Sequence, residues 1–196
     1  MENVDRGDFA MGLVRVVALH DEATATHLRA TAVLARRIAA SMHVAEQTAR
    51  VIELAGLLHD IGKVGVSREL LGKPAELTAH EWVEMRRHAE AGAGMLESIP
   101  TLADLAPIVR AHHERIDGTG YPDRLRGEDI PLEARVLAVA DAFHALTTDR
   151  PYRRAILPHA ALGVLRSSAG THFDVDVVSA TLDLFGHPPD ARRVCA

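Results

Sequence analysis

The chain is poor in cysteine: Cys195, next to the C-terminus, is the single cysteine in 196 residues. One thiol excludes both a disulfide framework and a zinc site built from cysteine thiolates. No apolar run reaches the roughly 18 residues that span a bilayer. The opening residues MENVDRGDF are polar and acidic where a secretory signal is basic and then apolar. We therefore expect a cytoplasmic protein that does not cross a membrane.

The chain also lacks an excess of positive charge. Its formal net charge is -5 at pH 7, so its surface as a whole is not one that binds DNA. The arginines are nevertheless unevenly spread, and many crowd one stretch: Arg110, Arg115, Arg124, Arg126, Arg150, Arg153 and Arg154. This leaves room for a local anion site in an acidic protein.

The length and composition, with 47% hydrophobic and 25% charged residues, are those of one soluble globular domain. Apolar residues recur at helical spacing along most of the chain, and no strand alternates convincingly. The expected helices cover residues 8–20, 27–42, 45–60, 78 to about 88, 90–98, 102–113, 132–147, 158–167 and 174–186. The sequence therefore predicts a single all-α domain.

One segment, residues 114–131, interrupts this pattern. Its glycines and prolines forbid a regular helix there: Gly118, Gly120, Pro122, Gly127 and Pro131. An ordered loop inside a helical protein usually exists for a function. We expect this loop to lie at a functional site.

Histidines and carboxylates recur at helix ends or on helices that face the core: His27, His59, Asp60, His88, His112, His113 and Asp141. Imidazole and carboxylate ligands without thiolates suit divalent Fe, Mn, Co, Ni or Zn. Seven ligands are too many for one ion and about right for two ions that share a bridging carboxylate. Two ions roughly 3.5–4 Å apart can hold a hydroxide between them and neutralise a phosphate during in-line attack.

The pair His59-Asp60 ends the apolar segment LAGLLHDIGK. Burying two unpaired ionisable groups is costly, so metal coordination would explain them, although an HD dipeptide taken alone is often only a helix end. If the helix continues, Lys63 shares their face. An amine there would bind a phosphoryl oxygen or protonate the departing alkoxide.

His112 and His113 open the irregular loop. A metalloprotease signature requires a second histidine four residues after the first, but Ile116 and Asp117 occupy those positions, so that class is excluded. Asp141 lies in the apolar segment VLAVADAFHAL. Its carboxylate is either a metal ligand or a buried group tied to a nearby arginine.

Four segments together resemble the HD-GYP family, a subgroup of the HD phosphohydrolases. LLHDIGKVGV is similar to the family's HD segment, and HHERIDGTGYPDRLRGEDIPLEARVLAVADAF to its GYP segment. TTDRPYRRA and GTHFDVDVV resemble later motifs of the family. The resemblance runs from about residue 15 to 186, so we expect one HD-GYP domain over residues 1–196 with a tail at 187–196.

The resemblance implies an all-α HD core extended by further helices, an Fe or Mn centre, and hydrolysis of cyclic di-GMP. Positions that match family metal ligands are His27, His59, Asp60, His88, His112, His113 and Asp141. Asp60 matches the bridging carboxylate and Lys63 the lysine beside the metals, and these two are the expected catalytic residues.

The same resemblance assigns the expected contacts to substrate. Tyr121 and Pro122 belong to the GYP loop near the substrate, and Arg150 and Arg153 match cationic positions that contact its phosphates or guanines. Guanidinium groups suit this task because they form paired hydrogen bonds and stack on bases.

The chain departs from the family pattern at three positions. Family members with three metals have a glutamate where this chain has Ala23, so we expect two ions. Two-metal members are associated chiefly with the first cleavage, which gives linear pGpG, so the second step to GMP is in doubt. Ala30 stands where an arginine is frequent. His144 stands three residues after Asp141, where the family has an acid. Its role is that of a partner of the metal ligands, an extra ligand or a tolerated substitution.

Two alternatives remain open. One is a signalling module that binds cyclic di-GMP, or a diguanylate cyclase (GGDEF) domain, with little or no turnover. The other is an HD phosphohydrolase that acts on another cyclic dinucleotide. No sensory or receiver domain is visible in the sequence, so either regulation comes from a separate sensor or receiver protein or the chain is an excised domain. A homodimer is also open.

Overall fold

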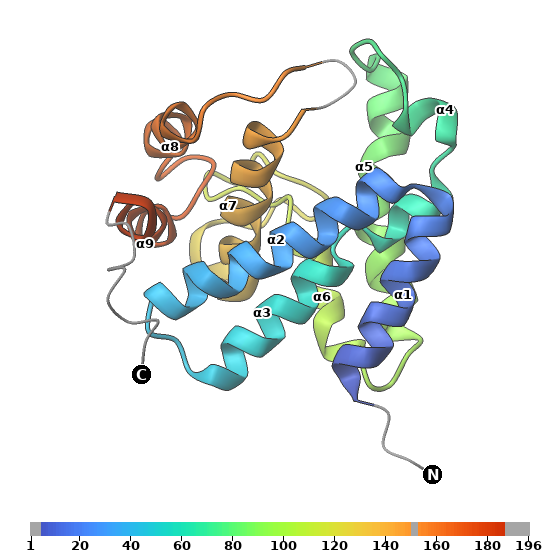
Figure 1. The fold of residues 1–196 in the computed structure, drawn as a ribbon, viewed down its shortest axis with the longest axis horizontal. Helices are drawn as coiled ribbons and strands as arrows, with labels where there is room; N and C mark the ends of the chain where they lie inside the picture. Colours follow the sequence, from blue (N-terminus) through green and yellow to red (C-terminus); the bar gives the residue numbers. More distant parts are fainter. Residues whose placement is uncertain (1–4, 150–152, 187–196) are drawn as a thin grey trace, which may run out of the picture.

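The computed structural model of this chain describes residues 5–149 and 153–186, and these are mainly helical (Figure 1). The α-helices are α1 (Arg6–His20), α2 (Glu22–Ser41), α3 (Glu46–Leu58), α4 (Arg68–Leu71), α5 (Ala79–Glu97), α6 (Ala106–Ala111), α7 (Leu132–Thr147), α8 (Pro158–Ser167) and α9 (Val175–Gly186). Short 3₁₀ helices are η1 (Ile61–Gly65), η2 (Ala103–Leu105) and η3 (Gly127–Asp129). Within these ranges no β-strand occurs, and an isolated bridge joins Ala169 and Phe173, which confirms the all-α prediction.

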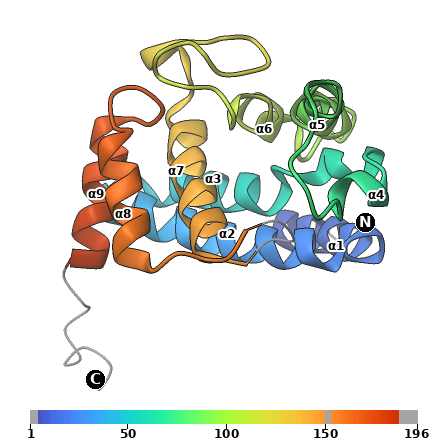
Figure 2. The same ribbon diagram turned by 90° about the horizontal axis from the view of Figure 1, so that it is seen from above.

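The helices form two layers joined by α7 (Figure 2). Helices α1, α2 and α3 lie on one side, and α5, α6 and the loop after α6 lie on the other. Helix α2 packs on α3 and α7, while α5 packs on α6 and η1. Helices α8 and α9 flank α7 at one end of the molecule. No helix in the described ranges is long and apolar enough to cross a membrane.

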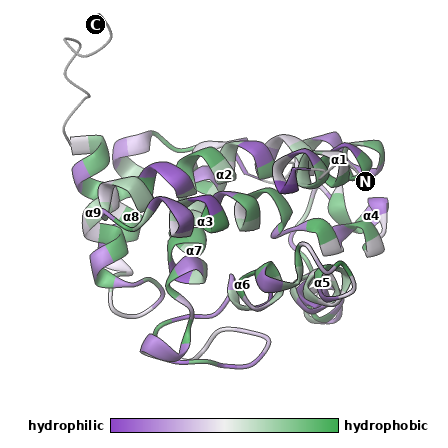
Figure 3. Ribbon diagram, turned by 90° about the horizontal axis from the view of Figure 1, so that it is seen from below, coloured by the Kyte–Doolittle hydropathy of each residue, from purple (hydrophilic) through white to green (hydrophobic). Residues whose placement is uncertain are grey.

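Most helices are amphipathic, and Figure 3 shows hydrophilic and hydrophobic residues alternating along them. Their apolar faces meet in one core, whose largest fully buried side chains include Leu28, Ile38, Ile52, Leu58 and Leu137. Burying a leucine or isoleucine side chain contributes roughly 1.5–3 kcal/mol. This core fixes the relative positions of α2, α3 and α7, which carry part of the candidate site.

Several predicted helix boundaries were wrong. Helix α5 runs unbroken through His88, because Ala89, Ala93 and Leu96 continue its buried face. The helix begins with a capping box, in which the Thr78 hydroxyl accepts from the Glu81 backbone N–H at 3.3 Å and the Glu81 side chain accepts from the Thr78 N–H at 2.7 Å. Helix α2 begins earlier than predicted, and the segment before α6 is a 3₁₀ turn.

The turn after α3 is set by a close approach between backbones. Helix α3 ends at Leu58, and η1 starts directly after Asp60. A Cβ atom on Gly62 would lie 2.0 Å from the carbonyl oxygen of His88, so only glycine allows η1 to lie against α5. This contact holds the carboxylate of Asp60 beside the imidazole of His88.

Candidate metal centre

Five helical segments bring the predicted ligands together. His27 lies on α2, His59 and Asp60 follow the last turn of α3, and His88 lies on α5. His112 and His113 follow α6, and Asp141 lies on α7. The buried members are 0–2% exposed: His59, Asp60, His88 and His112.

The ligand atoms fall into two groups that share one carboxylate. Asp60, His88, His112 and His113 each place one ligand atom within 4.8 Å of the others. His27, His59 and Asp60 form a second group by the same measure. Asp141 adjoins the second group, because its Oδ1 lies 2.9 Å from His27 Nε2 and 4.0 Å from His59 Nε2. The candidate ligands thus gather in two groups that have Asp60 in common.

Unpartnered polar atoms inside the cluster show that the donor set fits metal ions. His59 Nε2 and Asp60 Oδ1 are buried and have no hydrogen-bond partner within the described part of the chain. An unsatisfied buried polar atom costs about 1–3 kcal/mol. Bound cations would satisfy both atoms, and imidazole with carboxylate is the donor set of divalent transition metals.

Burial keeps the clustered histidines uncharged. It lowers the pKa of His88 to about 4 and that of His112 to about 4. It also lowers the pKa of His59 and takes that of His113 well below the usual value. Neutral imidazoles have the lone pairs that metal binding requires.

The two aspartates are held as anions. Burial acts to raise the pKa of Asp60, but the neighbouring ammonium group of Lys63 acts against it, and the pKa lies well below the ordinary value. Burial likewise opposes ionisation of Asp141, and the hydrogen bond from His27 outweighs it. Two carboxylates that remain charged in a buried site attract cations.

Lys63 lies beside Asp60, as predicted, but it reaches that position through a 3₁₀ turn and not through a continued α-helix. Its Nζ donates to Asp60 Oδ2 at 2.6 Å. The side chain is 20% exposed, so the ammonium group lies at the edge of the cluster. It can meet a ligand that approaches the shared carboxylate.

Among the residues that the structure describes, Asp141 is paired with histidine and not with arginine. The alternative of an arginine-paired carboxylate is therefore wrong within the described residues, where its ion-pair partners are His27 and His59. His144, one turn along α7, also meets this group, since its Nδ1 lies 2.8 Å from His27 Nδ1.

The irregular loop folds back over the cluster. The Tyr121 ring lies 4.9 Å from that of His113 between centroids, and burial and nearby carboxylates raise the pKa of the Tyr121 hydroxyl. A Cβ on Gly120 would lie 2.5 Å from the backbone of Glu114 and Arg115, so this fold also requires glycine. Pro122 follows in the same loop.

Two residues near the loop were missed from the sequence. Glu114 is 3% exposed, and its Oε1 accepts from the Asp123 backbone N–H at 2.6 Å. An acid directly after the His112-His113 pair was the available signal. Arg86 lies over the Tyr121 ring at 5.1 Å and near Trp82 at 5.9 Å, and no sequence signal singled it out.

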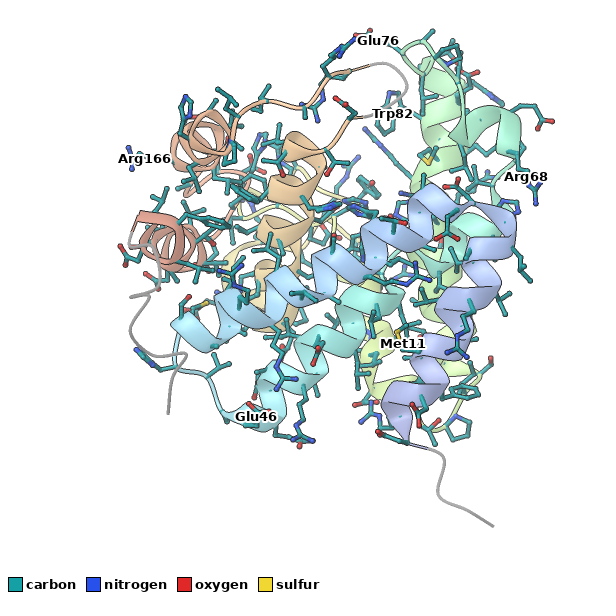
Figure 4. The ribbon with its side chains drawn as sticks, viewed as in Figure 1. Met11, Glu46, Arg68, Glu76, Trp82 and Arg166 are labelled. Carbon is teal, nitrogen blue, oxygen red and sulfur yellow. The ribbon has the colours of Figure 1, made fainter. Side chains whose placement is uncertain are left out.

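Arg86 is exposed and makes no ion pair among the described residues. Trp82, the labelled side chain of α5 in Figure 4, is 44% exposed. His113, Tyr121, Arg86 and Trp82 thus form a row of ring and guanidinium groups that leads outward from the cluster. Such groups stack on nucleobases and bind phosphate.

Two arginines, Arg150 and Arg153, were predicted to contact the substrate. Arg150 lies outside the described residues. Arg153 is half-buried, and one N–H of its guanidinium donates to the Ala145 carbonyl oxygen at 2.5 Å, which ties the segment after α7 back onto that helix.

Comparison with known protein families identifies the family to which the chain belongs. The model of the HD domain family matches residues 13–177. The chain belongs to the HD domain family. This confirms the resemblance found in its motifs, and the match covers every ligand of the two groups.

Curated relatives are similar over most of the chain. It is 41% identical over 172 residues to the cyclic di-GMP phosphodiesterase response regulator RpfG of Xanthomonas campestris, covering 87% of this chain and 46% of the relative. It is 35% identical over 178 residues to 3'3'-cGAMP-specific phosphodiesterase 2 of Vibrio cholerae, covering 90% of this chain and 34% of the relative. The chain thus spans less than half the length of these relatives.

A solved structure agrees on the fold. The HD domain chain has a TM-score of 0.68 to Bd1817, described as a HDG"Y"P protein from Bdellovibrio bacteriovorus. The match is 20% identical and covers 82% of this chain and 52% of the other. At that identity the likeness concerns the helical fold alone.

Proposed function

We propose that this HD domain is a metal-dependent phosphodiesterase that hydrolyses cyclic di-GMP, mainly to pGpG. The observation that carries the proposal is the sharing of Asp60 by two groups of ligand atoms. A shared carboxylate suits a two-metal centre for phosphodiester hydrolysis. The choice of cyclic di-GMP is supported by the name of the relative RpfG.

We assign His27, His59, Asp60 and Asp141 to one ion, and Asp60, His88, His112 and His113 to the other. Fe or Mn is proposed first, with Zn, Ni and Co as alternatives of the same donor preference. When bound, such ions supply positive charge to the phosphate and lower the pKa of a water molecule.

The remaining residues bind the substrate and direct a proton. Lys63, at the edge of the cluster, is proposed to donate a proton to the departing oxygen or to hold a non-bridging oxygen. Tyr121 and Pro122 would line the substrate, Arg150 and Arg153 would contact its phosphates or guanines, and the exposed guanidinium of Arg86 adds a further anion-binding group.

The test is turnover by metal-loaded protein. We expect protein reconstituted with Mn²⁺, or with Fe²⁺ without oxygen, to convert cyclic di-GMP to pGpG. Elemental analysis should give two ions per chain. Asp60→Ala, which removes the shared carboxylate, should abolish both metal retention and turnover. Metal-loaded protein that binds the dinucleotide without cleaving it would instead support a signalling module, including one that binds a diguanylate cyclase domain.

The second candidate function is hydrolysis of 3'3'-cGAMP. It is favoured by the 35% identity to a cGAMP-specific phosphodiesterase. Turnover of both dinucleotides in parallel discriminates the two. A kcat/KM higher for 3'3'-cGAMP than for cyclic di-GMP would replace the first candidate by the second.

A further inference from the structure

Helix α5 presents an exposed aromatic ring beside the candidate metal centre. Trp82 is 44% exposed and is the only tryptophan in the chain. Arg86 lies one turn further along α5, so the two side chains share a face of the helix. An indole ring left in water forgoes the large free energy that its burial supplies. A ligand that covers the ring would recover it.

The guanidinium group of Arg86 connects this ring to the loop over the cluster. Its Cζ lies 5.9 Å from the centroid of the Trp82 ring and 5.1 Å from that of the Tyr121 ring. The Tyr121 ring in turn lies 4.9 Å from that of His113, one of the candidate ligands. A continuous row of planar groups therefore runs from the ligands to the exposed tryptophan.

The charge of Arg86 is available to a ligand. Two other arginines of this region have carboxylate partners: Arg110 pairs with Asp123 at 2.7 Å and Arg115 with Asp117 at 3.0 Å. In the described ranges Arg86 makes no ion pair and lies against two rings instead. A guanidinium group stacked in this way uses its face, so the N–H donors at its edge stay available for a phosphate.

We propose that Trp82 and Arg86 form a purine-nucleotide subsite beside the metal centre. A purine base stacks on the Trp82 ring, and Arg86 donates to a phosphate oxygen that lies between this base and the cluster. Base stacking and a paired guanidinium–phosphate contact are interactions that a nucleotide makes readily. The inference rests on the proposed function and deepens it, because it assigns one nucleotide of the cyclic dinucleotide to α5.

The subsite recognises a class of ligand and not one base. Stacking tolerates different bases, because every base has a π face. Trp82 therefore accepts guanine and adenine alike, and it serves cyclic di-GMP and 3'3'-cGAMP equally. We expect Trp82→Leu to lower kcat/KM for both dinucleotides by the same factor.

The first test uses the fluorescence of Trp82. Because the chain has no other tryptophan, indole emission reports on residue 82 alone, and a stacked base should quench it. Protein loaded with diamagnetic Zn²⁺ is titrated with GMP, AMP and ribose 5-phosphate, which carry the same phosphate group with and without a base. We expect saturable quenching by GMP and AMP with similar dissociation constants, and none by ribose 5-phosphate. Emission that GMP leaves unchanged would overturn the proposal.

The second test removes the ring. Trp82→Leu keeps an apolar side chain without an aromatic face, and calorimetric titration should show GMP binding weakened about tenfold, within the usual loss for one base–ring contact. Trp82→Phe keeps a ring and should recover most of the affinity. The control Val83→Leu changes the neighbouring residue, which is 57% exposed, and should bind GMP as the wild type does. Equal affinity in wild type and Trp82→Leu would contradict the stacking role.

The third test removes the guanidinium group. Arg86→Gln should weaken the binding of GMP and ribose 5-phosphate alike, by about tenfold, because both carry the phosphate that a charged hydrogen bond holds. Arg87→Gln is the matched control: it loses the same charge at an adjacent exposed residue that points about 100° away around the helix. Equal losses in the two variants would mean that only the overall charge matters, and would refute the contact from Arg86.

The binding readouts use no turnover, so the two proposals fail separately. A protein that binds GMP as expected but cleaves no dinucleotide would refute the proposed function and leave the subsite standing. In an active protein, Trp82→Leu should raise the KM for cyclic di-GMP and leave kcat unchanged, as the loss of uniform binding does. Hydrolysis with an unchanged KM would refute the subsite and leave the proposed function standing.

Discussion

The buried histidines make the metal-free protein sensitive to acid. Burial lowers the pKa of His88 to about 4 and that of His112 to about 4, while an exposed histidine titrates near pH 6.5, roughly. Between these values the unfolded chain binds protons that the folded chain does not. Stability therefore rises with pH across this window and falls on acidification.

We expect the free energy of unfolding of the metal-free protein to fall as the pH is lowered from about 6.5 to about 4, by up to ~3 kcal/mol for each of these two histidines. Urea denaturation at a series of pH values measures it. His88→Asn should flatten the slope, whereas His159→Asn at an exposed position should not. An unchanged stability across the window would contradict the neutral state assigned to the buried rings.

At the scale of elements, the centre depends on how closely η1 approaches α5. A Cβ at residue 62 would lie 2.0 Å from the His88 carbonyl oxygen, whereas one at Gly65 in the same turn meets nothing within 4 Å. Gly62→Ala must therefore push η1 away from α5 and separate Asp60 from His88. Gly65→Ala is the matched control.

We expect Gly62→Ala to lose roughly 1–3 kcal/mol of stability, the usual cost of overpacking, and to retain less metal than the wild type. Urea denaturation and elemental analysis of the purified protein measure the two effects. Gly65→Ala should match the wild type in both. Full metal retention by Gly62→Ala would show that the approach of η1 to α5 does not position the ligands.

At the scale of the whole molecule, bound ions would link both layers of the fold. Their ligands come from α2, the turn after α3, α5, the residues after α6, and α7. An ion that binds only the folded chain stabilises it by mass action, about 2.7 kcal/mol at a concentration one hundred times its dissociation constant.

Removal of metal by a chelator should therefore lower the melting temperature, by about 5–10 °C for a domain of this size. Differential scanning calorimetry before and after chelation, and after return of Mn²⁺, gives the measurement. Asp60→Ala should not respond to the chelator. An identical melting temperature with and without metal would argue against ions that link the two layers.

Local features of the sequence were sufficient for much of the fold. The predicted helices 132–147 and 158–167 coincide with α7 and α8, because hydrophobic periodicity and a leading proline are local signals. The break predicted near His88 was wrong, since continued packing of α5 depends on residues from other helices. The contact of Gly62 with α5, which sets the turn after Asp60, is not visible in the neighbouring sequence either.

For the candidate site, too, the sequence and the tertiary structure contributed different information. By itself, the sequence singled out the candidate ligands, because residue types and motif spacing are properties of the chain. The resemblance implied that Asp60 bridges, but only the tertiary structure decided which ligands gather on each side of it, that Arg86 lies over Tyr121, and that His144 meets His27 across 117 positions of sequence. Those contacts depend on how α2, α5 and α7 pack, and packing is set by the whole core at once.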